Sequence, residues 1–178
     1  ASNTKLYSSA AALDILGPDY RFETEIWAMG RVENGILNGH LIIRGSGDPV
    51  IGGRFTDGDV TAYFRAWADS LKAAGITTIR GDIIGDDDAY DEEAIGYGWQ
   101  YDDLPYWYAA ELSALSFNDN AVDFRLEAST PGSPAILSWE PMMTSYVTAR
   151  NASMTTEAGG SIEEDYFRPQ GSNDFVLG

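Results

Sequence analysis

Residues 60–84 read VTAYFRAWADSLKAAGITTIRGDII, and this stretch decides the fold. Its larger apolar side chains recur at helical spacing, at Tyr63, Trp67, Leu71 and Ala74. They predict a helix over residues 60–74 that ends before Gly75, followed by a strand over residues 77–84. Together with an extended run that ends at residues 41–44, this order of strand, helix and strand favours a right-handed crossover with parallel pairing.

A hairpin is expected on the N-terminal side of this unit. Polar and apolar residues alternate over residues 22–28, and a second extended run ends at residues 41–44. Between them lies the pair Asn34-Gly35, which is typical of a tight turn with left-handed backbone angles. The sequence therefore predicts two antiparallel strands before the helix.

The second half of the chain has the pattern of short strands. The expected segments are residues 121–128, 135–139 and 145–149, with Tyr166 and residues 175–177 near the end. Pro131-Gly132 supplies a turn between the first two. The fold class predicted for the whole chain is α+β, a mixed α-β protein without internal repeats.

Composition excludes several classes of function. The 178 residues are 44% hydrophobic and 12% aromatic, which is typical of a globular protein, and no apolar run approaches the roughly 20 residues of a membrane helix. A net charge of −17 opposes binding to nucleic acid or anionic lipid surfaces. With no cysteine and one histidine, His40, the chain lacks the ligands of thiolate or histidine metal centres, and a Ser-His-Asp triad is not expected. No cofactor or metal is expected.

Ser2 and Lys5 place a hydroxyl and an amine at the start of a helix that is expected over residues 3–16 and ends at Gly17. A spacing of three puts both side chains on one helix face. A partly desolvated lysine can take the proton of a serine hydroxyl, and backbone N–H groups at a helix start can stabilise an oxyanion. The alternative is structural: Ser2 or Thr4 caps the helix, and Lys5 is solvated.

Two short motifs are interpreted as turns. Gly45-Ser46-Gly47-Asp48-Pro49 follows a strand, but its glycine spacing is not that of a nucleotide-binding loop. Ser116-Phe117-Asn118 imitates the Ser-x-Asn element of penicillin-recognising enzymes, but Asn118-Asp119-Asn120 has the composition of a turn.

An acidic loop over residues 86–93 holds six carboxylates in eight positions. These could bind a hard cation such as calcium, but the residue order of an EF-hand loop is absent, so a solvated loop is favoured. Beyond it, aromatic side chains surround Asp102 and Asp103; they are Trp99, Tyr101, Tyr106, Trp107 and Tyr108. They either line a substrate site or form a small aromatic core under a long loop, and the sequence leaves both open.

Several segments, taken in chain order, resemble one known family. They are residues 1–6 (ASNTKL), 16–22 (LGPDYRF), 39–49 (GHLIIRGSGDP), 75–76 (GI), 81–87 (GDIIGDD), 98–99 (GW), 108–110 (YAA), 114–115 (AL) and 118–120 (NDN). In these segments the chain is similar to the class C penicillin-binding proteins, the D-alanyl-D-alanine carboxypeptidase/endopeptidase family.

The resemblance implies a serine-type peptidase that trims peptidoglycan stem peptides and is acylated by β-lactams. Ser2 would be the nucleophile, Lys5 its base, and the Ser2 backbone N–H half of the oxyanion hole. Residues 1–21 would be a stub of the catalytic domain, and residues 22–178 the accessory domains that the family inserts before its Ser-x-Asn and Lys-Thr-Gly motifs. Because no Lys-Thr-Gly occurs in the sequence, this chain alone is expected to be nearly inactive.

The resemblance also implies substrate contacts and a location. The family's Gly-Trp stretch, with the acidic and aromatic residues after it, lies near the mouth of the substrate site and corresponds here to Trp99, Asp102 and Tyr106. A periplasmic or secreted protein is expected, and a motif at the second residue suggests that a signal peptide has been removed. The competing hypothesis is a non-catalytic acidic module that binds the cell wall, in which Ser2 is only a helix cap.

Overall fold

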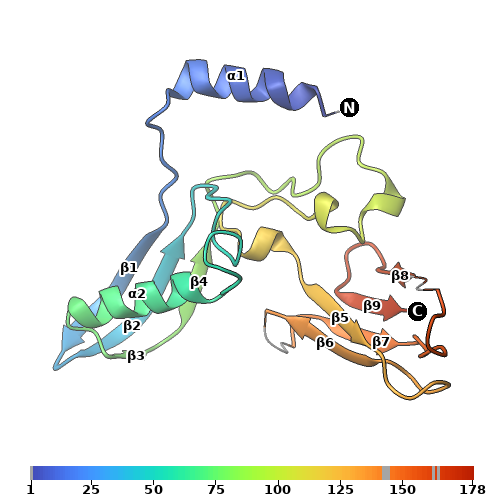
Figure 1. Cartoon of the computed structure of the whole chain (residues 1–178). Coiled ribbons are helices and arrows are strands. Elements are labelled where there is room, and N and C mark those ends of the chain that lie inside the picture. Colours follow the sequence, from blue (N-terminus) through green and yellow to red (C-terminus); the bar gives the residue numbers. More distant parts are fainter. Residues whose placement is uncertain (1, 142–144, 162, 164) are drawn as a thin grey trace.

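The computed structural model describes residues 2–141, 145–161, 163 and 165–178, and it is a mixed α-β protein (Figure 1). Its helices and strands, in chain order, are α1 (Thr4–Leu16), β1 (Glu25–Glu33), β2 (Ile36–Arg44), α2 (Ala62–Ala73), β3 (Thr78–Arg80), β4 (Ile83–Asp86), β5 (Asp123–Glu127), β6 (Ile136–Glu140), β7 (Thr148–Asn151), β8 (Tyr166–Phe167) and β9 (Asp174–Leu177). Short 3₁₀ helices lie at Tyr101–Asp103, Trp107–Ala109 and Asn118–Asn120. The predicted fold class is confirmed.

The expected hairpin is formed by β1 and β2. The strands are antiparallel, with a register that runs from the pair Glu25 and Arg44 to the pair Glu33 and Ile36. The turn residue Asn34 has φ 50° and is followed by a glycine with φ 79°. Two successive left-handed residues match the twist of the flanking strands, which is why this dipeptide closes the hairpin.

The crossover through α2 returns the chain parallel to β2, as predicted. Both β3 and β4 pair with β2 in one register, with Leu37 opposite Ile79 and Leu41 opposite Ile83. The single strand expected over residues 77–84 is wrong in detail, because two short strands flank Gly81 and Asp82. There the Asp82 N–H donates to His40 Nδ1 at 3.2 Å rather than to a strand carbonyl, so the ladder is interrupted.

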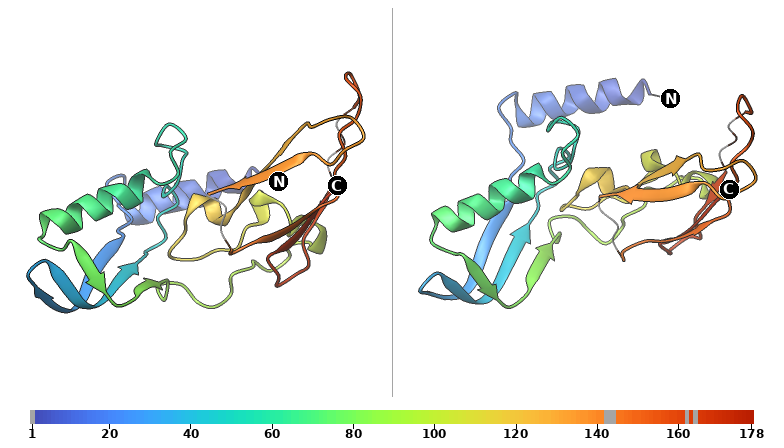
Figure 2. Two further views of the ribbon diagram at one scale, coloured as in Figure 1. Left: turned by 90° about the horizontal axis from the view of Figure 1, so that it is seen from below. Right: turned by 60° about the horizontal axis from the view of Figure 1, so that its bottom comes forward.

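The hydrophobic core of this unit lies between the sheet and α2. Leu37, Leu41 and Ile76 are buried, and Leu71 from α2 packs against them. Figures 1 and 2 show α2 on one face of the β1–β4 sheet. The opposite face carries a row formed by Trp27, Ile42 and Ile84, paired across three strands, in which Trp27 is 49% exposed.

The second half consists of two small sheets. Strands β5 and β6 are antiparallel, while β9 lies between β7, to which it is parallel, and β8, to which it is antiparallel. Phe124 joins the two sheets, because its ring contacts Trp139 at 5.9 Å and Phe175 at 4.8 Å between centroids. A long connection over residues 87–122 links this half to the β1–β4 unit (Figure 2).

Helix α1 stands away from both halves in the view of Figure 1. Every one of its residues is exposed, including Leu6 at 72% and Ile15 at 78%. Leu6 and Ile15 lie on opposite sides of the helix, a distribution typical of a helix that is buried all round. The accessible surface of the chain is 12847 Å², against roughly 8,500 Å² for a compact monomer of this mass.

Candidate functional site

Ser2 and Lys5 lie one helical turn apart at the start of α1. The Lys5 backbone N–H donates to the Ser2 carbonyl at 3.0 Å, and both residues are exposed. The N-cap residue is Asn3, and no side chain caps this helix start in the part of the chain that the structure describes. The cap by Ser2 or Thr4 in the structural alternative is therefore not seen, whereas its other part, a solvated Lys5, agrees with the exposure of that residue.

The C-terminal end of α1 follows from its sequence. Gly17 has φ 82°, and its N–H donates to the Leu13 carbonyl at 3.0 Å. A left-handed glycine at this position ends a helix without strain, and Pro18 cannot continue it. The residue at which α1 ends is thus determined by its neighbouring residues alone.

The other three candidate residues lie far along the chain, in residues 99–108, which we call the aromatic loop. Trp99 is 37% exposed, Asp102 is exposed within the first 3₁₀ helix, and the Tyr106 N–H donates to the Asp103 carbonyl at 2.9 Å. Tyr106 lines a large groove in the second half of the chain, whereas Ser2, Lys5, Trp99 and Asp102 do not. The structure does not bring the five candidates together in one cavity of the described residues.

Tyr106 belongs to an aromatic cluster that fixes this loop to β8. Its ring stacks on Tyr108 with centroids 5.3 Å apart and meets Tyr166 edge-on at 5.0 Å. The Tyr108 hydroxyl donates to Asp103 Oδ1 at 3.2 Å. Partial burial, followed by this bond to a carboxylate, raises the pKa of Tyr108. The carboxylate that engages the aromatic rings is thus Asp103, the neighbour of the residue that the sequence suggested.

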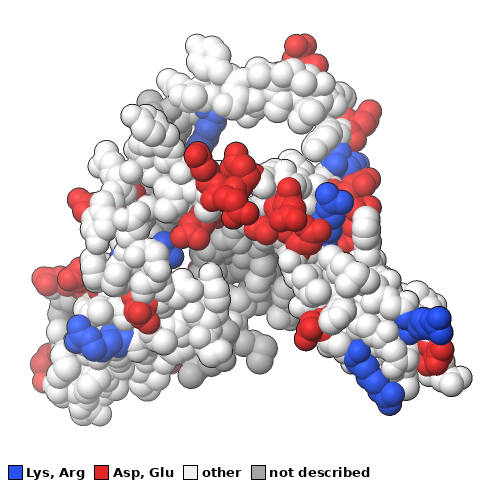
Figure 3. Space-filling model, turned by 180° about the vertical axis from the view of Figure 1, so that it is seen from behind, with Lys and Arg blue, Asp and Glu red and all other residues white. Residues whose placement is uncertain are grey.

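The acidic loop uses several carboxylates for local bonds. Asp87 accepts from the Ser113 hydroxyl at 2.8 Å, Asp86 lies 3.7 Å from Arg44, and Asp91 accepts from the Glu93 N–H at 3.1 Å. Acidic side chains gather below α1 on the face shown in Figure 3. Within the described residues, no group of three acidic or histidine side chains is arranged to hold a metal ion.

The glycine-rich turn after β2 has a packing role. A Cβ on Gly45 would overlap the Ala114 carbonyl oxygen, and one on Gly47 would overlap the Tyr90 hydroxyl. The Gly47 N–H donates to the same Ala114 carbonyl at 2.7 Å. Both glycines therefore allow close approach of the long connection, which agrees with the interpretation as a structural turn.

The Ser-x-Asn segment, residues 116–118, also belongs to a local turn. Asn118, Asp119 and Asn120 have φ values of 52°, 56° and 51°, three successive left-handed residues. The Asn118 N–H donates to the Ile51 carbonyl at 2.8 Å, and the Ser116 hydroxyl donates to the Ser113 carbonyl at 2.9 Å. Asparagine and aspartate tolerate this backbone region best, which explains the composition of the turn.

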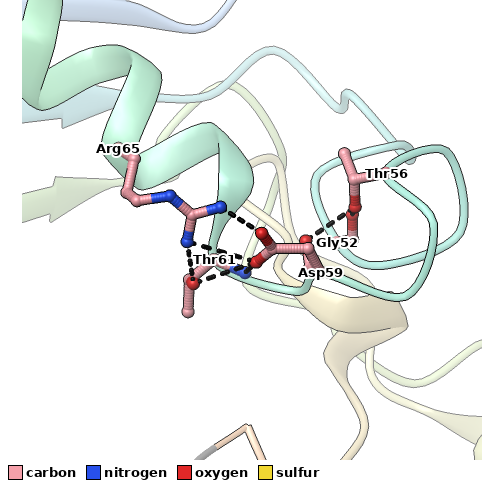
Figure 4. A network of polar contacts seen from close by, with 5 residues as sticks. All are labelled: Gly52, Thr56, Asp59, Thr61 and Arg65. Carbon is pink, nitrogen blue, oxygen red and sulfur yellow. Dashed lines mark hydrogen bonds and ion pairs between the residues drawn. The ribbon is translucent and has the colours of Figure 1, made fainter.

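A polar network fixes the start of α2 (Figure 4). Asp59 accepts from the Thr61 N–H and hydroxyl, each at 3.1 Å, and forms an ion pair with Arg65. The hydrogen bond from Arg65 is the largest influence and lowers the pKa of Asp59. The Thr56 hydroxyl donates to the Gly52 carbonyl at 3.0 Å, so the preceding loop is held as well.

Comparison with known proteins identifies the family. The family model of D-Ala-D-Ala carboxypeptidase 3 (S13) matches residues 1–178. The chain belongs to this family. It is 31% identical to D-alanyl-D-alanine carboxypeptidase from Actinomadura sp. (strain R39) over 189 aligned positions, which cover 99% of the chain and 32% of the relative. It is also 31% identical to D-alanyl-D-alanine carboxypeptidase DacB from Haemophilus influenzae, over 74% of the chain and 26% of that protein.

Solved structures of this S13 family share the fold. Penicillin-binding protein 4 (dacB) from Haemophilus influenzae matches with a TM-score of 0.76 and 23% identity, over 99% of this chain and 37% of that one. The same protein in complex with a novel β-lactam matches with a TM-score of 0.62 and 20% identity. This S13 chain thus spans about a third or less of the curated relatives it matches. Its described helices are all too short or too polar to cross a membrane.

The sequence missed two residues that the structure makes prominent, Glu111 and Arg168. They lie close together in the groove of the second half, where Arg168 is largely buried. One signal was present, because Arg168 is the only basic residue between residues 151 and 178. A single cation in an acidic segment is a reason to search for its partner.

Proposed function

We propose that this S13 chain is part of a serine-type D-Ala-D-Ala carboxypeptidase/endopeptidase that acts on peptidoglycan stem peptides through an acyl-enzyme on Ser2. The observation that supports it best is the pairing of Ser2 and Lys5 one turn apart at a helix start, in a chain matched by the family model from end to end. The curated relatives named above are D-alanyl-D-alanine carboxypeptidases.

The chemistry assigns one role to each group. The Ser2 hydroxyl oxygen attacks the carbonyl carbon between the two D-alanines, its proton moves to Lys5 Nζ, and the Ser2 N–H donates to the oxyanion. Collapse of this intermediate releases D-alanine, which takes a proton from Lys5, and leaves an ester on Ser2. Water then attacks the ester and gives a proton to Lys5, which passes it to the Ser2 oxygen as the acyl–oxygen bond breaks, so the peptide leaves with a free carboxyl group and the enzyme is regenerated.

Lys5 needs a drier environment than it has in this chain. It is exposed here, and a lysine accepts a proton readily only when burial or a neighbouring cation disfavours its charged form. We therefore assign residues 1–21 to a catalytic domain whose remaining part covers α1, and residues 22–178 to accessory structure. The uncovered apolar side chains of α1 and the large accessible surface support this division.

Substrate and inhibitor contacts follow from the same proposal. Trp99, Asp102 and Tyr106 lie near the mouth of the substrate site, where the exposed Asp102 carboxylate pairs with an ammonium group of the stem peptide. β-Lactams acylate Ser2 in place of the peptide. The protein acts in the periplasm or after secretion, where its substrate is found.

A second candidate function is a non-catalytic module that binds the cell wall. The observation that favours it is the charge of −17, with exposed carboxylates gathered on one face (Figure 3). In that case Ser2 and Lys5 have no chemical role, and the face binds cationic groups of the wall.

Release of D-alanine from a stem pentapeptide separates the two functions. A protein with the full length of the curated relatives is expected to release D-alanine. Ser2→Ala in that protein is expected to abolish the release. Ser8→Ala is the matched control, because Ser8 lies on the same helix and its hydroxyl donates to the Thr4 carbonyl at 3.3 Å, a bond within that helix. Unchanged release by Ser2→Ala would contradict the proposal.

A further inference from the structure

A groove with an apolar floor lies in the second half of the chain. It has a volume of about 1650 Å³ and is lined by the aromatic loop, by β5, β8 and β9, and by loop residues that flank β6 and β7. Its apolar lining includes Leu104, Tyr106, Phe124, Tyr166, Phe175 and Leu177. Ser2 and Lys5 do not line it, so the reacting groups of the acyl transfer proposed above lie outside it, and Tyr106 is the one proposed substrate contact among its lining residues.

Arg168 places a cation in this groove with few partners. Its side chain is only 17% exposed, and its Cζ lies 6.0 Å from the centroid of the Phe175 ring. Its Nε is buried and has no hydrogen-bond partner in the described part of the chain. The carboxylate of Glu111 is 3.9 Å from Arg168 Nη2, beyond hydrogen-bond distance, and is 49% exposed.

A largely buried guanidinium with an unpaired N–H donor has an unfavourable free energy. Removing a charge from water is costly unless the charge is both paired and hydrogen-bonded. The guanidinium presents its N–H donors as a rigid planar fork, and the group that satisfies two of them at once is a carboxylate. The aromatic ring beneath Arg168 stabilises the cation but accepts no conventional hydrogen bond.

We propose that this groove binds the C-terminal end of a short apolar peptide, with its free carboxylate on Arg168 and its side chains against Phe124 and Phe175. The charges around the groove restrict the ligand further. Its other described ionisable lining residues are mostly acidic: Asp87, Glu111, Asp123, Glu127, Glu157, Glu163 and Asp165. They oppose every negative charge that is not placed on Arg168, so a peptide end whose only charge is its carboxylate is favoured over one with a second negative charge.

The test is a calorimetric titration of the full 178-residue chain with N-acetyl-alanyl-leucine and with its C-terminal amide. The acid is expected to bind at least about tenfold more tightly than the amide, because only the acid forms charge-assisted bonds with Arg168. Arg168→Gln should remove this preference. Arg168→Lys should retain only part of it, because an ammonium lacks the planar fork.

Two further variants make the test specific. Arg125→Gln is the matched control, since Arg125 on β5 is 76% exposed and does not line the groove, and it should leave the preference unchanged. Glu111→Gln should tighten binding of the acid, because it removes the carboxylate nearest to Arg168. Circular dichroism shows whether Arg168→Gln folds. If it does not, the affinities of the original chain and of Glu111→Gln for the acid and for the amide still test the proposal.

Three results would overturn the proposal. The first is that the acid shows no saturable binding, which is also the result if another part of the protein already fills the groove. The second is equal affinity for the acid and the amide. The third is a preference for the acid that persists in folded Arg168→Gln.

Discussion

The backbone N–H of Lys5 donates to the carbonyl of Ser2 at 3.0 Å, so the backbones of the candidate nucleophile and of its candidate base lie one turn apart where α1 begins. This pairing depends on local backbone structure and not on the rest of the fold. A domain that packs over α1 can therefore desolvate Lys5 without changing its spacing from Ser2.

Substitution of Lys5 tests the role of the base. In the full-length protein, Lys5→Ala is expected to lower the rate of acylation by a penicillin by about 10²–10⁴, the usual contribution of acid–base assistance. Lys5→Arg should not restore the rate, because a guanidinium stays protonated and cannot accept the serine proton. Stopped-flow acylation measures both variants, and near-normal acylation by either, in a folded protein, would remove Lys5 from the mechanism.

Hydrogen exchange tests whether α1 lacks its packing partner in this chain. Its residues are all exposed, so the amides from Lys5 to Leu13 should exchange faster than those from Tyr63 to Leu71 in α2. A short helix without tertiary contacts is marginally stable in water. Equal protection in the two helices would mean that α1 is already packed, and the assignment of residues 1–21 to a larger catalytic domain would have to be abandoned.

Leu37 tests the core between the sheet and α2. Its side chain is fully buried, so Leu37→Ala should lower the free energy of unfolding by about 2–5 kcal/mol. Val32→Ala on the neighbouring strand is the control, because Val32 is 47% exposed and should cost much less. Urea denaturation of both variants gives the comparison, and a similar loss for the two would show that this core does not hold the unit together.

The stability of the β7–β9 pair should fall in acid. Hydrogen bonds from Thr148, the larger influence, and from Ser172 lower the pKa of Asp174 below its ordinary value of 3.8. A carboxyl whose pKa is depressed by folding stabilises the protein fully above the unfolded pKa and loses that contribution as pH falls through the folded one. The loss should therefore begin near pH 4 and continue below it.

NMR titration of the Asp174 carboxyl measures this effect. Thr148→Ala should move the pKa of Asp174 back toward its ordinary value, and Asp174→Asn should reduce the fall in stability below about pH 4. The same titration midpoint for Asp174 with and without the Thr148 hydroxyl would show that this bond does not set the pKa.

Calcium should have little effect on the acidic loop. Asp86, Asp87 and Asp91 already accept bonds from neighbouring groups, and the loop lacks a cage-forming order of ligands. Millimolar calcium is therefore expected to leave the Tm nearly unchanged. Stoichiometric micromolar binding in a calorimeter, lost in Asp87→Asn, would prove the expectation wrong.

Local chemistry explains which parts of the fold could be predicted. Asn34-Gly35 requires left-handed angles, and Tyr63, Trp67 and Leu71 mark one helix face, so the hairpin and α2 follow from neighbouring residues. The break at Asp82 could not be predicted, because it depends on a bond to His40 from a distant strand. Pattern alone does not reveal such pairings.

The same distinction holds for the candidate site. Ser2 and Lys5 are three positions apart in sequence and are joined by a backbone hydrogen bond, while the roles of their side chains stay a prediction. Arg168 and Glu111 meet only because β8 and the aromatic loop pack together, and the hydrogen bond from Tyr108 to Asp103 depends on where the tyrosine ring lies. Tertiary packing decided each of these, and composition gave at most a hint.

The most direct test of the central claim is the intact mass of the full-length protein after incubation with a labelled penicillin, followed by peptide mapping. The account predicts one covalent adduct, located on Ser2, that is absent from Ser2→Ala and present in Ser8→Ala. An adduct on another residue, or no adduct on a folded protein, would contradict the assignment of Ser2 as the nucleophile.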